Sequence, residues 1–316
     1  MTTLEHANGG YAVIHPATTP RFLMCPPEHF AVAYTINPWM DPQSWAREEG
    51  ALALSSRREW AALRRDLLSL GAAIELVDPV PGLPDLVFTA NAAVVLDCKV
   101  LLASFRHPQR QGEEEHFAQA FNALKARGLI DSVTRLPDDL KLEGAGDCVW
   151  DDTRQLFWMG YGPRSDAAAP PVVADVFGVE TVALELADPR FYHLDTALCP
   201  LPRGEVLFVP GAFTPEGRAT IHALVEPHAR IEVPPADAAC LAANAVAVGD
   251  TLVMPACSEE LRARLAARGY RPLVVPLPSF RRSGGSAYCL TLRLDRVSDE
   301  AELRRPARRQ IGSRAS

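Results

Sequence analysis

Residues 60–77 read WAALRRDLLSLGAAIELV. Apolar residues in the first part of this stretch recur every three or four positions, as on the buried face of an amphipathic helix, and Gly71 follows the last of them. Residues 74–77 then form a short, mainly apolar run that predicts a strand. The stretch therefore predicts a helix that ends at a glycine and leads directly into a strand. The apolar residues of this helix are Trp60, Leu63, Leu67 and Leu70.

Four further units of this kind follow along the chain. In three of them the helical pattern ends at a glycine, namely Gly128, Gly178 and Gly269, whereas the unit from 215 to 233 lacks such a glycine. A polar motif follows each unit at a separation of roughly 50 residues, and a fixed period of this size is typical of repeat and propeller architectures. We therefore expect five structurally equivalent units. They cover 60–77, 117–128, 171–186, 215–233 and 261–275.

The polar motifs place chemically active side chains at equivalent points of the repeat. If the five units close in a ring, the ends of their inner strands converge on one axis and the motifs share one central cleft. An open α/β sheet is the alternative, since it also alternates strands and helices, but no glycine-rich nucleotide-binding loop follows any strand. We expect a single α/β propeller domain over residues 1–296 and a frayed, arginine-rich tail over 297–316. The motifs hold Asn91, Glu143 with Asp147, His193 with Asp195, Asn244, and Cys289.

The composition is typical of a water-soluble globular protein. The 316 residues are 48% apolar and 22% charged, with a formal net charge of −7, so neither a nucleic acid nor an anionic membrane is expected as a partner. No apolar run approaches the length of ~18 residues that suggests a membrane span. Residues 1–10 do not resemble a secretory signal, so we expect a cytoplasmic protein. The seven cysteines are scattered without a Cys-x-x-Cys pair, which favours free thiols over a zinc site or disulfides.

Cys289 lies in the stretch SGGSAYCLTLRL, residues 283–294. Gly284 and Gly285 give the backbone freedom in front of the cysteine, and the alternating apolar residues behind it predict a strand that the cysteine opens. A thiol attacks as the thiolate, which a nearby imidazolium such as that of His193 would favour. A buried structural cysteine is the alternative, and we favour it for the other cysteines. For Cys289 the glycine pair favours a reactive thiol at the mouth of a cleft.

His193 and Asp195 stand two positions apart in FYHLDT, residues 191–196. In a strand such residues point to the same face, so this segment would present an imidazole beside a carboxylate. A lone histidine is usually a surface or core residue, but this pairing is unusual for a purely structural strand. In the motif LEGAGD, Glu143 or Asp147 could accept the other N–H of the histidine and fix its tautomer. A simple Gly-Asp turn would look the same.

Two further groups of polar residues could bind a substrate. Asp85 and Asn91 bracket an expected strand, and the Asn91 amide could bind a planar amide or amidine group, although turn residues at strand ends would look similar. Arg106, Arg110 and Arg164 fall in expected loops. Loop arginines are mostly solvated, but their forked guanidinium groups also suit a substrate carboxylate.

Taken in order, these motifs resemble those of the guanidino-group-modifying enzymes. This superfamily includes arginine deiminases, amidinotransferases, dimethylarginine dimethylaminohydrolases and the cyanobacterial arginine dihydrolases. The resemblance extends from about Asn37 to Leu294 and implies a five-bladed α/β propeller of the pentein type. The matching motifs are Phe-Thr-Ala-Asn91, Glu143-Gly-Ala-Gly-Asp147, His193-Leu-Asp195, and a Gly-Gly pair separated by three residues from Cys289.

The resemblance implies roles for the matching residues. Cys289 would be the nucleophile, His193 the general acid and base, and Glu143 the carboxylate that orients the histidine. Asp195 would bind the guanidinium group of the substrate. No metal or organic cofactor is implied, and a homo-oligomer is compatible with the sequence. The further substrate-binding candidates are Arg110 and Arg164 for an α-carboxylate, with Asp85, Asn91, Asp147, Asn37 and Asn244.

Two positions bear on the substrate. By the resemblance, deiminases and dimethylarginine dimethylaminohydrolases hold an aspartate at the position of Asn91, whereas arginine dihydrolases of the cyanobacterial type hold an asparagine there. Asp195 is present, whereas many dimethylarginine dimethylaminohydrolases lack it. Both differences favour hydrolysis of arginine to ornithine or citrulline through a covalent amidino-thioether on Cys289. The alternatives are dimethylarginine hydrolysis, amidino transfer to an amine, and a catalytically silent propeller that only binds a small ligand or a protein.

Overall fold

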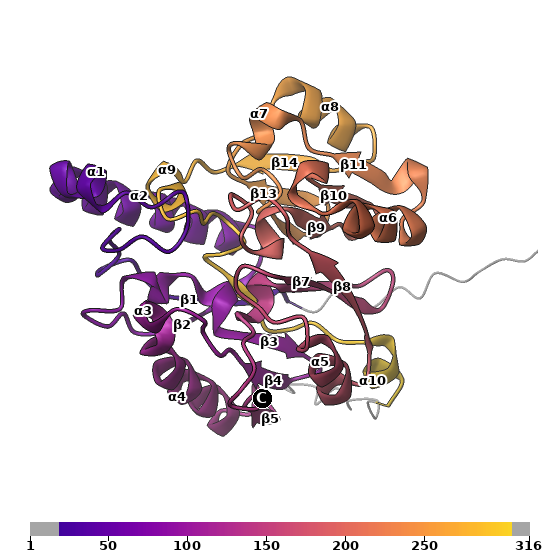
Figure 1. The fold of residues 1–316 in the computed structure, drawn as a ribbon, viewed down its shortest axis with the longest axis horizontal. Helices are drawn as coiled ribbons and strands as arrows, with labels where there is room; N and C mark the ends of the chain where they lie inside the picture. The colour runs from indigo at the N-terminus through magenta and orange to yellow at the C-terminus, as the bar shows by residue number, and fades with distance from the viewer. Residues whose placement is uncertain (1–18, 305–316) are drawn as a thin grey trace, which may run out of the picture.

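Five three-stranded sheets form a ring in the computed structural model, which describes residues 19–304 (Figure 1). The inner strand of every sheet contributes residues to the lining of one cavity on the axis of the ring, so the sheets are the blades of a propeller. The expected five-bladed α/β propeller is confirmed. The strands are β1 (Arg21–Met24), β2 (Ala73–Leu76), β3 (Ala93–Leu96), β4 (Lys99–Leu102), β5 (Ser132–Thr134), β6 (Cys148–Asp151), β7 (Leu156–Tyr161), β8 (Glu180–Glu185), β9 (Leu198–Pro200), β10 (Val206–Phe208), β11 (Arg230–Glu232), β12 (Val246–Val248), β13 (Thr251–Met254), β14 (Arg271–Val274) and β15 (Leu292–Arg293).

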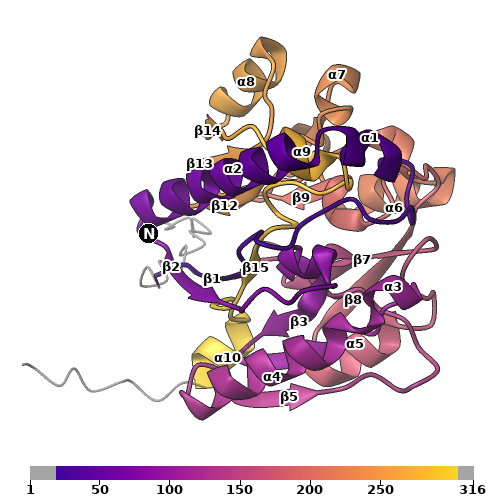
Figure 2. The ribbon, with the colours of Figure 1, turned by 90° about the vertical axis from the view of Figure 1, so that its left-hand side faces the viewer.

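Every blade has the same strand pattern. The inner strand runs antiparallel to the middle strand, and the middle strand runs parallel to the outer one. Parallel neighbours need a long crossover, and helices supply it on the outside of the ring (Figures 1 and 2). The helices are α1 (Pro42–Arg47), α2 (Glu49–Ser69), α3 (Pro108–Gln111), α4 (Glu113–Ala126), α5 (Pro170–Phe177), α6 (Pro215–Leu224), α7 (Pro235–Ala238), α8 (Glu259–Ala266), α9 (Pro278–Arg281) and α10 (Asp299–Arg304).

The first blade joins the two ends of the described chain. β15 pairs antiparallel with β1, so that Leu292 lies opposite Leu23 and Arg293 opposite Phe22. β1 in turn pairs in parallel with β2, and the three strands lie side by side in Figure 2. The ring is therefore closed by backbone pairing between its N-terminal and C-terminal strands.

The glycines expected to end the helices do so. Gly71, Gly128, Gly178 and Gly269 all have positive φ, between 72° and 85°, the left-handed conformation that favours glycine after a helix. The fourth unit lacks such a glycine, and α6 ends instead at the extended residue Val225. The expected helices end within about three residues of the observed ones, but α2 and α4 begin earlier than expected, at Glu49 and Glu113.

The core lies between each helix and its sheet. In the second blade, Phe117 and Phe121 of α4 are fully buried in one cluster with Val100 and Leu102 of β4. This packing removes the apolar face of the helix from water, which is the main stabilising term for an amphipathic helix. Within residues 19–304, no helix is long and apolar enough to cross a membrane.

The polar motifs form tight turns rather than strands, and three expectations are corrected here. His193 directly precedes the 3₁₀ turn Leu194–Thr196 and Asp195 lies within it, so the two residues do not lie on one face of a strand. Asp85 and Asn91 lie in two successive 3₁₀ turns instead of bracketing a strand. Cys289 lies in a turn in which the Leu290 amide bonds the Ser286 carbonyl, and the strand begins only at Leu292. Each connection must bend sharply to reach the axis, which an extended strand cannot do.

The segment after Arg296 differs in part from the expected frayed tail. Ser298 donates from its amide and its hydroxyl to the two carboxylate oxygens of Asp97, at 2.7 and 2.8 Å. Residues 299–304 then form α10. The remainder of the expected tail, residues 305–316, and residues 1–18 of the expected domain lie outside the described residues.

Candidate active site

The connections between the blades meet at one end of the axis. Each runs from the outer strand of one blade to the inner strand of the next, and each carries one of the polar motifs. Three of these connections, those that carry Asn91, His193 and Cys289, line a cavity with a free volume of about 10 Å³, which is space for about one water molecule. Of the predicted site residues, those that line this cavity are Asn37, Asp85, Asn91, Arg110, Arg164, His193 and Cys289.

Cys289 is held by two polar side chains. Its side chain is 2% exposed, and Sγ lies 3.1 Å from Oδ2 of Asp195 and 3.1 Å from Nδ2 of Asn244. The amides of Tyr288 and Cys289 both donate to Oδ1 of Asn244, at 3.0 and 3.2 Å. Asn244, which was expected among the substrate-binding residues, thus fixes both the backbone turn and the sulfur.

The environment of Cys289 raises the pKa of its thiol. Burial disfavours the thiolate, and the Asp195 carboxylate beside it raises the pKa further, well above the usual range. This differs from the expected imidazolium-lowered pKa, because the group that contacts the sulfur is an acid rather than His193. In the absence of a cationic ligand, the thiol keeps its proton at neutral pH.

Gly284 and Gly285 allow the chain to pass close to two aromatic rings. Gly284 has a φ of +78°, and a Cβ there would lie 2.6 Å from Cε1 of Tyr192. A Cβ at Gly285 would lie 2.4 Å from Cε1 of Phe88. Both distances are too short for any side chain, so the glycine pair is needed for close approach in front of Cys289.

His193 is oriented by Glu143. Nε2 of His193 lies 2.8 Å from Oε2 of Glu143, and Nη1 of Arg164 donates to the same oxygen at 2.9 Å. Both the acid and the histidine are buried. Nδ1 of His193 has no hydrogen-bond partner within the described part of the chain, so it remains available to accept a proton.

The charge states of this pair follow from their surroundings. Burial opposes ionisation of Glu143, but the Arg164 guanidinium and the hydrogen bond from His193 outweigh it and hold the Glu143 pKa below its usual range. Burial lowers the pKa of His193 to about 4, although Glu143 opposes that shift. At neutral pH the site therefore holds a carboxylate and a neutral imidazole, which is the state of a general base.

Asp85 and Asp195 each carry an unsatisfied buried oxygen. Oδ1 of both residues has no hydrogen-bond partner among the described residues. Oδ2 of Asp85 accepts from the Tyr34 hydroxyl at 2.8 Å, and Oδ2 of Asp195 accepts from Cys289. Burial raises the pKa of Asp195 to about 7 and also raises that of Asp85. Unpaired buried carboxylate oxygens are costly, and a ligand with several N–H donors would satisfy them.

Asn91 is fixed by a buried ion pair. Arg110 binds Glu113 through two nitrogens, at 2.9 and 2.7 Å, and its Nη1 donates to Oδ1 of Asn91 at 2.8 Å. Because an arginine can only donate, the Asn91 oxygen must face it. Nδ2 of Asn91 then donates to the Glu143 carbonyl at 3.1 Å, which leaves its second N–H without a partner among residues 19–304.

The expected carboxylate-binding arginines already have protein partners. Arg110 is occupied by Glu113 and Asn91, while Arg164 bonds Glu143 and the Ile36 carbonyl and stacks on Tyr192, with 4.6 Å to the ring centre. Both line the cavity, and the structure shows them bracing the site. Their binding of a substrate carboxylate stays a prediction.

Asp147 and Asn37 occupy different places. Asp147, like Glu143, Asp195 and Asn244, is not among the residues that line the cavity. Its two oxygens accept from the Ser165 hydroxyl at 2.6 Å and the Leu194 amide at 3.0 Å. It therefore braces the turn that carries His193, and the geometry gives it no substrate contact. Asn37 lines the cavity and donates to the Ser283 carbonyl at 3.0 Å.

Several contributors were missed in the sequence. Tyr192 donates to the Ser283 carbonyl at 2.9 Å, and Ser165 accepts from the Glu143 amide at 3.0 Å. Glu113 could have been found, because it stands three residues after Arg110 at helical spacing. Tyr34 and Ser165 carry no local signal. Among the described residues, no group of three or more His, Cys, Asp or Glu residues is placed to hold a metal ion.

A family model described as N,N dimethylarginine dimethylhydrolase, eukaryotic, matches residues 27–296. The chain belongs to this family of guanidino-group-modifying enzymes. The resemblance inferred from the motifs is thereby confirmed. The matched residues include every strand except β1, every connection that carries a polar motif, and all the predicted site residues.

Curated relatives carry two different names. The bifunctional arginine dihydrolase/ornithine cyclodeaminase AgrE of Nostoc sp. strain PCC 7120 is 43% identical over 285 residues, covering 89% of this chain and 38% of that protein. The N(G),N(G)-dimethylarginine dimethylaminohydrolase of Mycobacterium tuberculosis is 38% identical over 276 residues, covering 87% of this chain and 86% of that protein. The chain thus spans less than two fifths of the bifunctional relatives.

Solved structures give the same relationship. The N-terminal domain of ArgZ, an arginine dihydrolase from cyanobacteria solved as a Cys-to-Ser mutant bound to substrate, matches with a TM-score of 0.82 at 40% identity, over 88% of this chain and 99% of that one. AgrE as a Cys-to-Ala mutant with L-arginine matches equally well, with a TM-score of 0.82 at 40% identity over 88% of this chain and 40% of that one. A dimethylarginine dimethylaminohydrolase adduct, at 20% identity and a TM-score of 0.67, shares the fold.

Proposed function

We propose that the chain is a cysteine-dependent hydrolase of the arginine guanidino group, of the dihydrolase type. It would convert arginine and two water molecules into ornithine, two ammonia molecules and carbon dioxide. The observation that carries this proposal is the orientation of Asn91. With its oxygen turned to Arg110, Asn91 keeps one amide N–H without a partner among the described residues, and its side chain lines the cavity. A donor suits the oxygen of a ureido group, whereas a carboxylate at this position would repel it.

The first half of the reaction would use the guanidinium charge to activate the thiol. A guanidinium group bound to Asp195 would displace the thiol hydrogen bond and offset the negative charge that raises the Cys289 pKa. The thiol proton would pass to Nδ1 of His193, and Sγ would attack the guanidinium carbon. The resulting imidazolium, stabilised by Glu143, would return this proton to the departing nitrogen, which leaves as ammonia.

The second half would use His193 as a base. The neutral imidazole would take a proton from water, the hydroxide would add to the amidino-thioether, and Sγ would leave to give a ureido group. In a dihydrolase, Sγ of Cys289 would then attack the ureido carbon, and the remaining terminal nitrogen would leave as ammonia. Hydrolysis of the resulting thioester-like intermediate would release carbon dioxide and ornithine. The neutral ureido product stays bound for this second round only if the site accepts its carbonyl oxygen. The N–H group of Asn91 would donate a hydrogen bond to that oxygen.

Product analysis tests this proposal. The protein is incubated with arginine, with asymmetric dimethylarginine and with citrulline, and the amino acids and amines released are quantified. We expect ornithine from arginine, with about two ammonia molecules for each ornithine. Citrulline as the end product would favour a deiminase reaction, and a transferred amidino group in the presence of glycine would favour a transferase. No turnover of any guanidino compound would contradict the proposal.

The Asn91→Asp variant tests the carrying observation. A carboxylate there would bind the guanidinium cation but repel the ureido oxygen, so we expect arginine turnover to continue with citrulline rather than ornithine accumulating. Asn122→Asp is the matched control, because it makes the same chemical change on an exposed position of α4. An unchanged ornithine yield in Asn91→Asp would remove the argument for a dihydrolase.

Dimethylarginine hydrolysis is the second candidate, favoured by the match to the mycobacterial enzyme over most of both chains. The groups that would surround the terminal guanidino nitrogens are polar, namely Asp195, Asn91 and the carbonyl of Glu143. Two methyl groups would remove N–H donors from these polar groups, and the apolar surface of the cavity is supplied by Ile36, Phe88 and Tyr192. Release of dimethylamine at a rate above that of ammonia from arginine would favour this candidate instead.

A further inference from the structure

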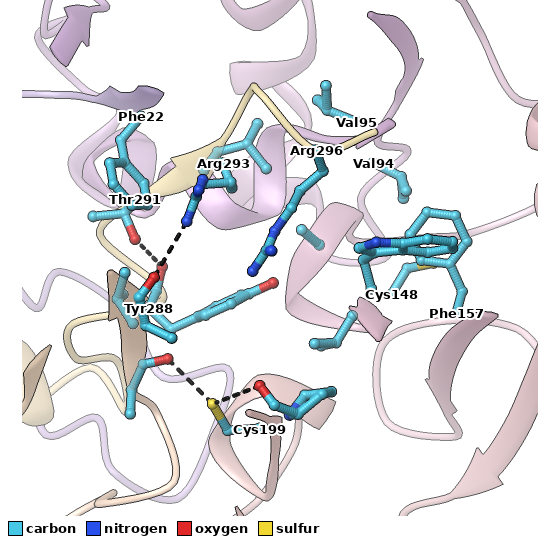
Figure 3. Close-up of a pocket in the computed structure, with 18 residues that line it drawn as sticks. Phe22, Val94, Val95, Cys148, Phe157, Cys199, Tyr288, Thr291, Arg293 and Arg296 are labelled. Carbon is cyan, nitrogen blue, oxygen red and sulfur yellow. Dashed lines mark hydrogen bonds between the residues drawn. The ribbon is translucent and has the colours of Figure 1, made fainter. Parts of the chain in front are cut away.

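The inner strands enclose a second cavity on the propeller axis, here called the axial chamber. It shares no lining residue with the cavity that contains Cys289. Its free volume is about 50 Å³, which is space for roughly three to five water molecules. Figure 3 shows this chamber, with the side chains of Arg293, Arg296 and Tyr288 extending into it.

The walls of the axial chamber are apolar, and the charged residues that line it carry only one sign. Val94, Val95 and Val149 are among its apolar residues. The charged side chains that line it are Arg293 and Arg296, and no aspartate or glutamate lines it among the described residues. A small cavity that combines arginines with apolar walls has the character of a site for an organic anion.

Two uncharged hydrogen-bond donors of the chamber are left without acceptors. Trp150 is 7% exposed, and its Nε1–H has no partner among the described residues. The Tyr288 hydroxyl likewise makes no hydrogen bond within residues 19–304, while the Tyr288 backbone amide is bonded to Asn244. For Trp150, whose Nε1 is fully buried, a missing acceptor costs roughly 1–3 kcal/mol, whereas the Tyr288 hydroxyl is not among the fully buried unpaired atoms.

Arg296 is the cation with unused donors. One of its nitrogens, Nη1, is paired with Asp152, while Nε and Nη2 have no partner in the described part of the chain. Its guanidinium group points toward Tyr288 (Figure 3). Its side chain is 26% exposed, and although partial burial lowers the pKa of Arg296 to about 10, the guanidinium stays charged at neutral pH and can attract an anion. Arg293, by contrast, is already held by Asp295 and the Ala247 carbonyl.

We propose that the axial chamber is a binding site for a small organic monocarboxylate. The carboxylate would accept from Arg296, Trp150 and the Tyr288 hydroxyl, and a chain of one or two further carbons would pack against the valines. Inorganic phosphate fits less well, because its oxygens need donors on every side and the walls supply donors on one. Tyr288 directly precedes Cys289, so an occupant would contact the segment that carries the thiol.

Calorimetric titration of the full chain with sodium propionate at constant ionic strength tests this site. We expect saturable binding of one propionate per chain, and no binding of the neutral analogue propionamide at the same concentration. Inorganic phosphate should bind at least about tenfold more weakly than propionate, since it loses the apolar contacts. Absence of saturable propionate binding, or equal binding of propionamide, would overturn the proposal.

Two variants with matched controls locate the bound carboxylate. Trp150→Phe removes the N–H and keeps most of the ring, and it should weaken propionate binding about tenfold, the effect of one hydrogen bond to a charged group. Trp45→Phe is its control, because Trp45 Nε1 is also buried without an acceptor but does not line the chamber. Arg296→Met should weaken binding further, and Arg127→Met should leave it unchanged, since Arg127 pairs with Glu75 away from the chamber.

The pattern across these variants separates the two cavities. Propionate bound beside Cys289 would be insensitive to both Trp150→Phe and Arg296→Met, and that result would overturn the assignment. Urea denaturation of each variant shows whether it is folded under the titration conditions. The more conservative Trp150→Phe keeps the test decisive even if Arg296→Met, which leaves Asp152 without its partner, fails to fold.

Discussion

At the scale of single residues, the site contains buried carboxylates whose negative charge is not compensated until a cation binds. Asp85 and Asp195 are buried with one unpaired oxygen each, and Asp195 also raises the pKa of the Cys289 thiol. Groups held in this way reduce stability until a ligand pairs with them, and active sites commonly show such shifts. The free protein is therefore expected to be less stable, and its thiol less reactive, than the protein with a bound guanidinium group.

The Asp195→Asn variant tests this cost. Burial raises the pKa of Asp195 to about 7 in the folded protein, above the unfolded value of about 3.9. The contribution of this group to stability is therefore fully present below pH ~4 and is lost as the pH rises through ~7. We expect the stability of Asp195→Asn relative to wild type to increase across this window, by up to about 4 kcal/mol. Urea denaturation at pH 5 and pH 8 measures it; a difference independent of pH would contradict the assignment.

The reactivity of Cys289 gives a second residue-scale prediction. Because burial and Asp195 raise its pKa, we expect slow alkylation by iodoacetamide at pH 7, faster alkylation as the pH rises, and faster alkylation in Asp195→Asn at equal pH. Mass spectrometry of the peptide that contains Cys289 measures the rate. Rapid alkylation of the wild-type protein at pH 7, which the sequence alone suggested, would show that the thiol is already activated without a ligand.

At the scale of elements, the helices and strands of the five repeated units were predictable, whereas the connections between the blades were not. The α2 and α4 patterns follow from apolar spacing and a glycine stop, which are local properties. The turns at His193 and Cys289 depend on partners that are distant in sequence. At Cys289, for example, Oδ1 of Asn244 accepts hydrogen bonds from the backbone amides of Tyr288 and Cys289, more than 40 positions away. The alternating residues 290–294 favoured a longer strand, and this tertiary contact overrode the pattern.

The Gly285→Ala variant tests the close approach in front of the cysteine. Its new Cβ would lie 2.4 Å from Cε1 of Phe88, so either the ring or the segment carrying Cys289 must move. A shift of about 1 Å at a reacting group can cost up to about 100-fold in rate, and we expect a loss of at least about tenfold in kcat/KM for arginine.

Gly128→Ala is the matched control for this loss. Gly128 has a φ of +72°, and an added Cβ there would meet nothing within 4 Å. It should therefore lose about 1–2 kcal/mol of stability from backbone strain while keeping its activity. Measuring kcat/KM and urea denaturation for both variants separates the two effects. Equal activity of the two variants would show that the approach at Gly285 does not position the thiol.

At the scale of the whole molecule, the period of about 50 residues identified the five-fold ring but not the way it closes. The closing strand β15 has only two residues, and its partner β1 lies about 270 positions earlier in the chain. No local pattern marks such a short strand. The convergence of the motifs at one end of the axis nevertheless follows from the ring, because equivalent connections reach equivalent ends of the inner strands. This is why Asn91, His193 and Cys289 could be grouped from sequence.

The Leu292→Asp variant tests closure of the ring. Leu292 is 2% exposed and lies opposite Leu23, so a carboxylate there should destabilise the protein by about 3–5 kcal/mol. We expect faster amide exchange in β1 and β2 as well as in β15, measured by hydrogen–deuterium exchange. Leu224→Asp is the control, since Leu224 is 40% exposed. Faster exchange confined to residues 286–294 would show that the first blade holds together without β15.

The late position of β15 also affects how the protein emerges from the ribosome. Synthesis runs from the N-terminal end, so the imidazole, the amides and the acids of four blades leave the exit tunnel before the sulfur does. Until the segment that follows Cys289 has emerged, β1 has no inner neighbour and the circle stays open. A translation product cut short before codon 289 would therefore lack the thiol on which the proposed hydrolysis depends.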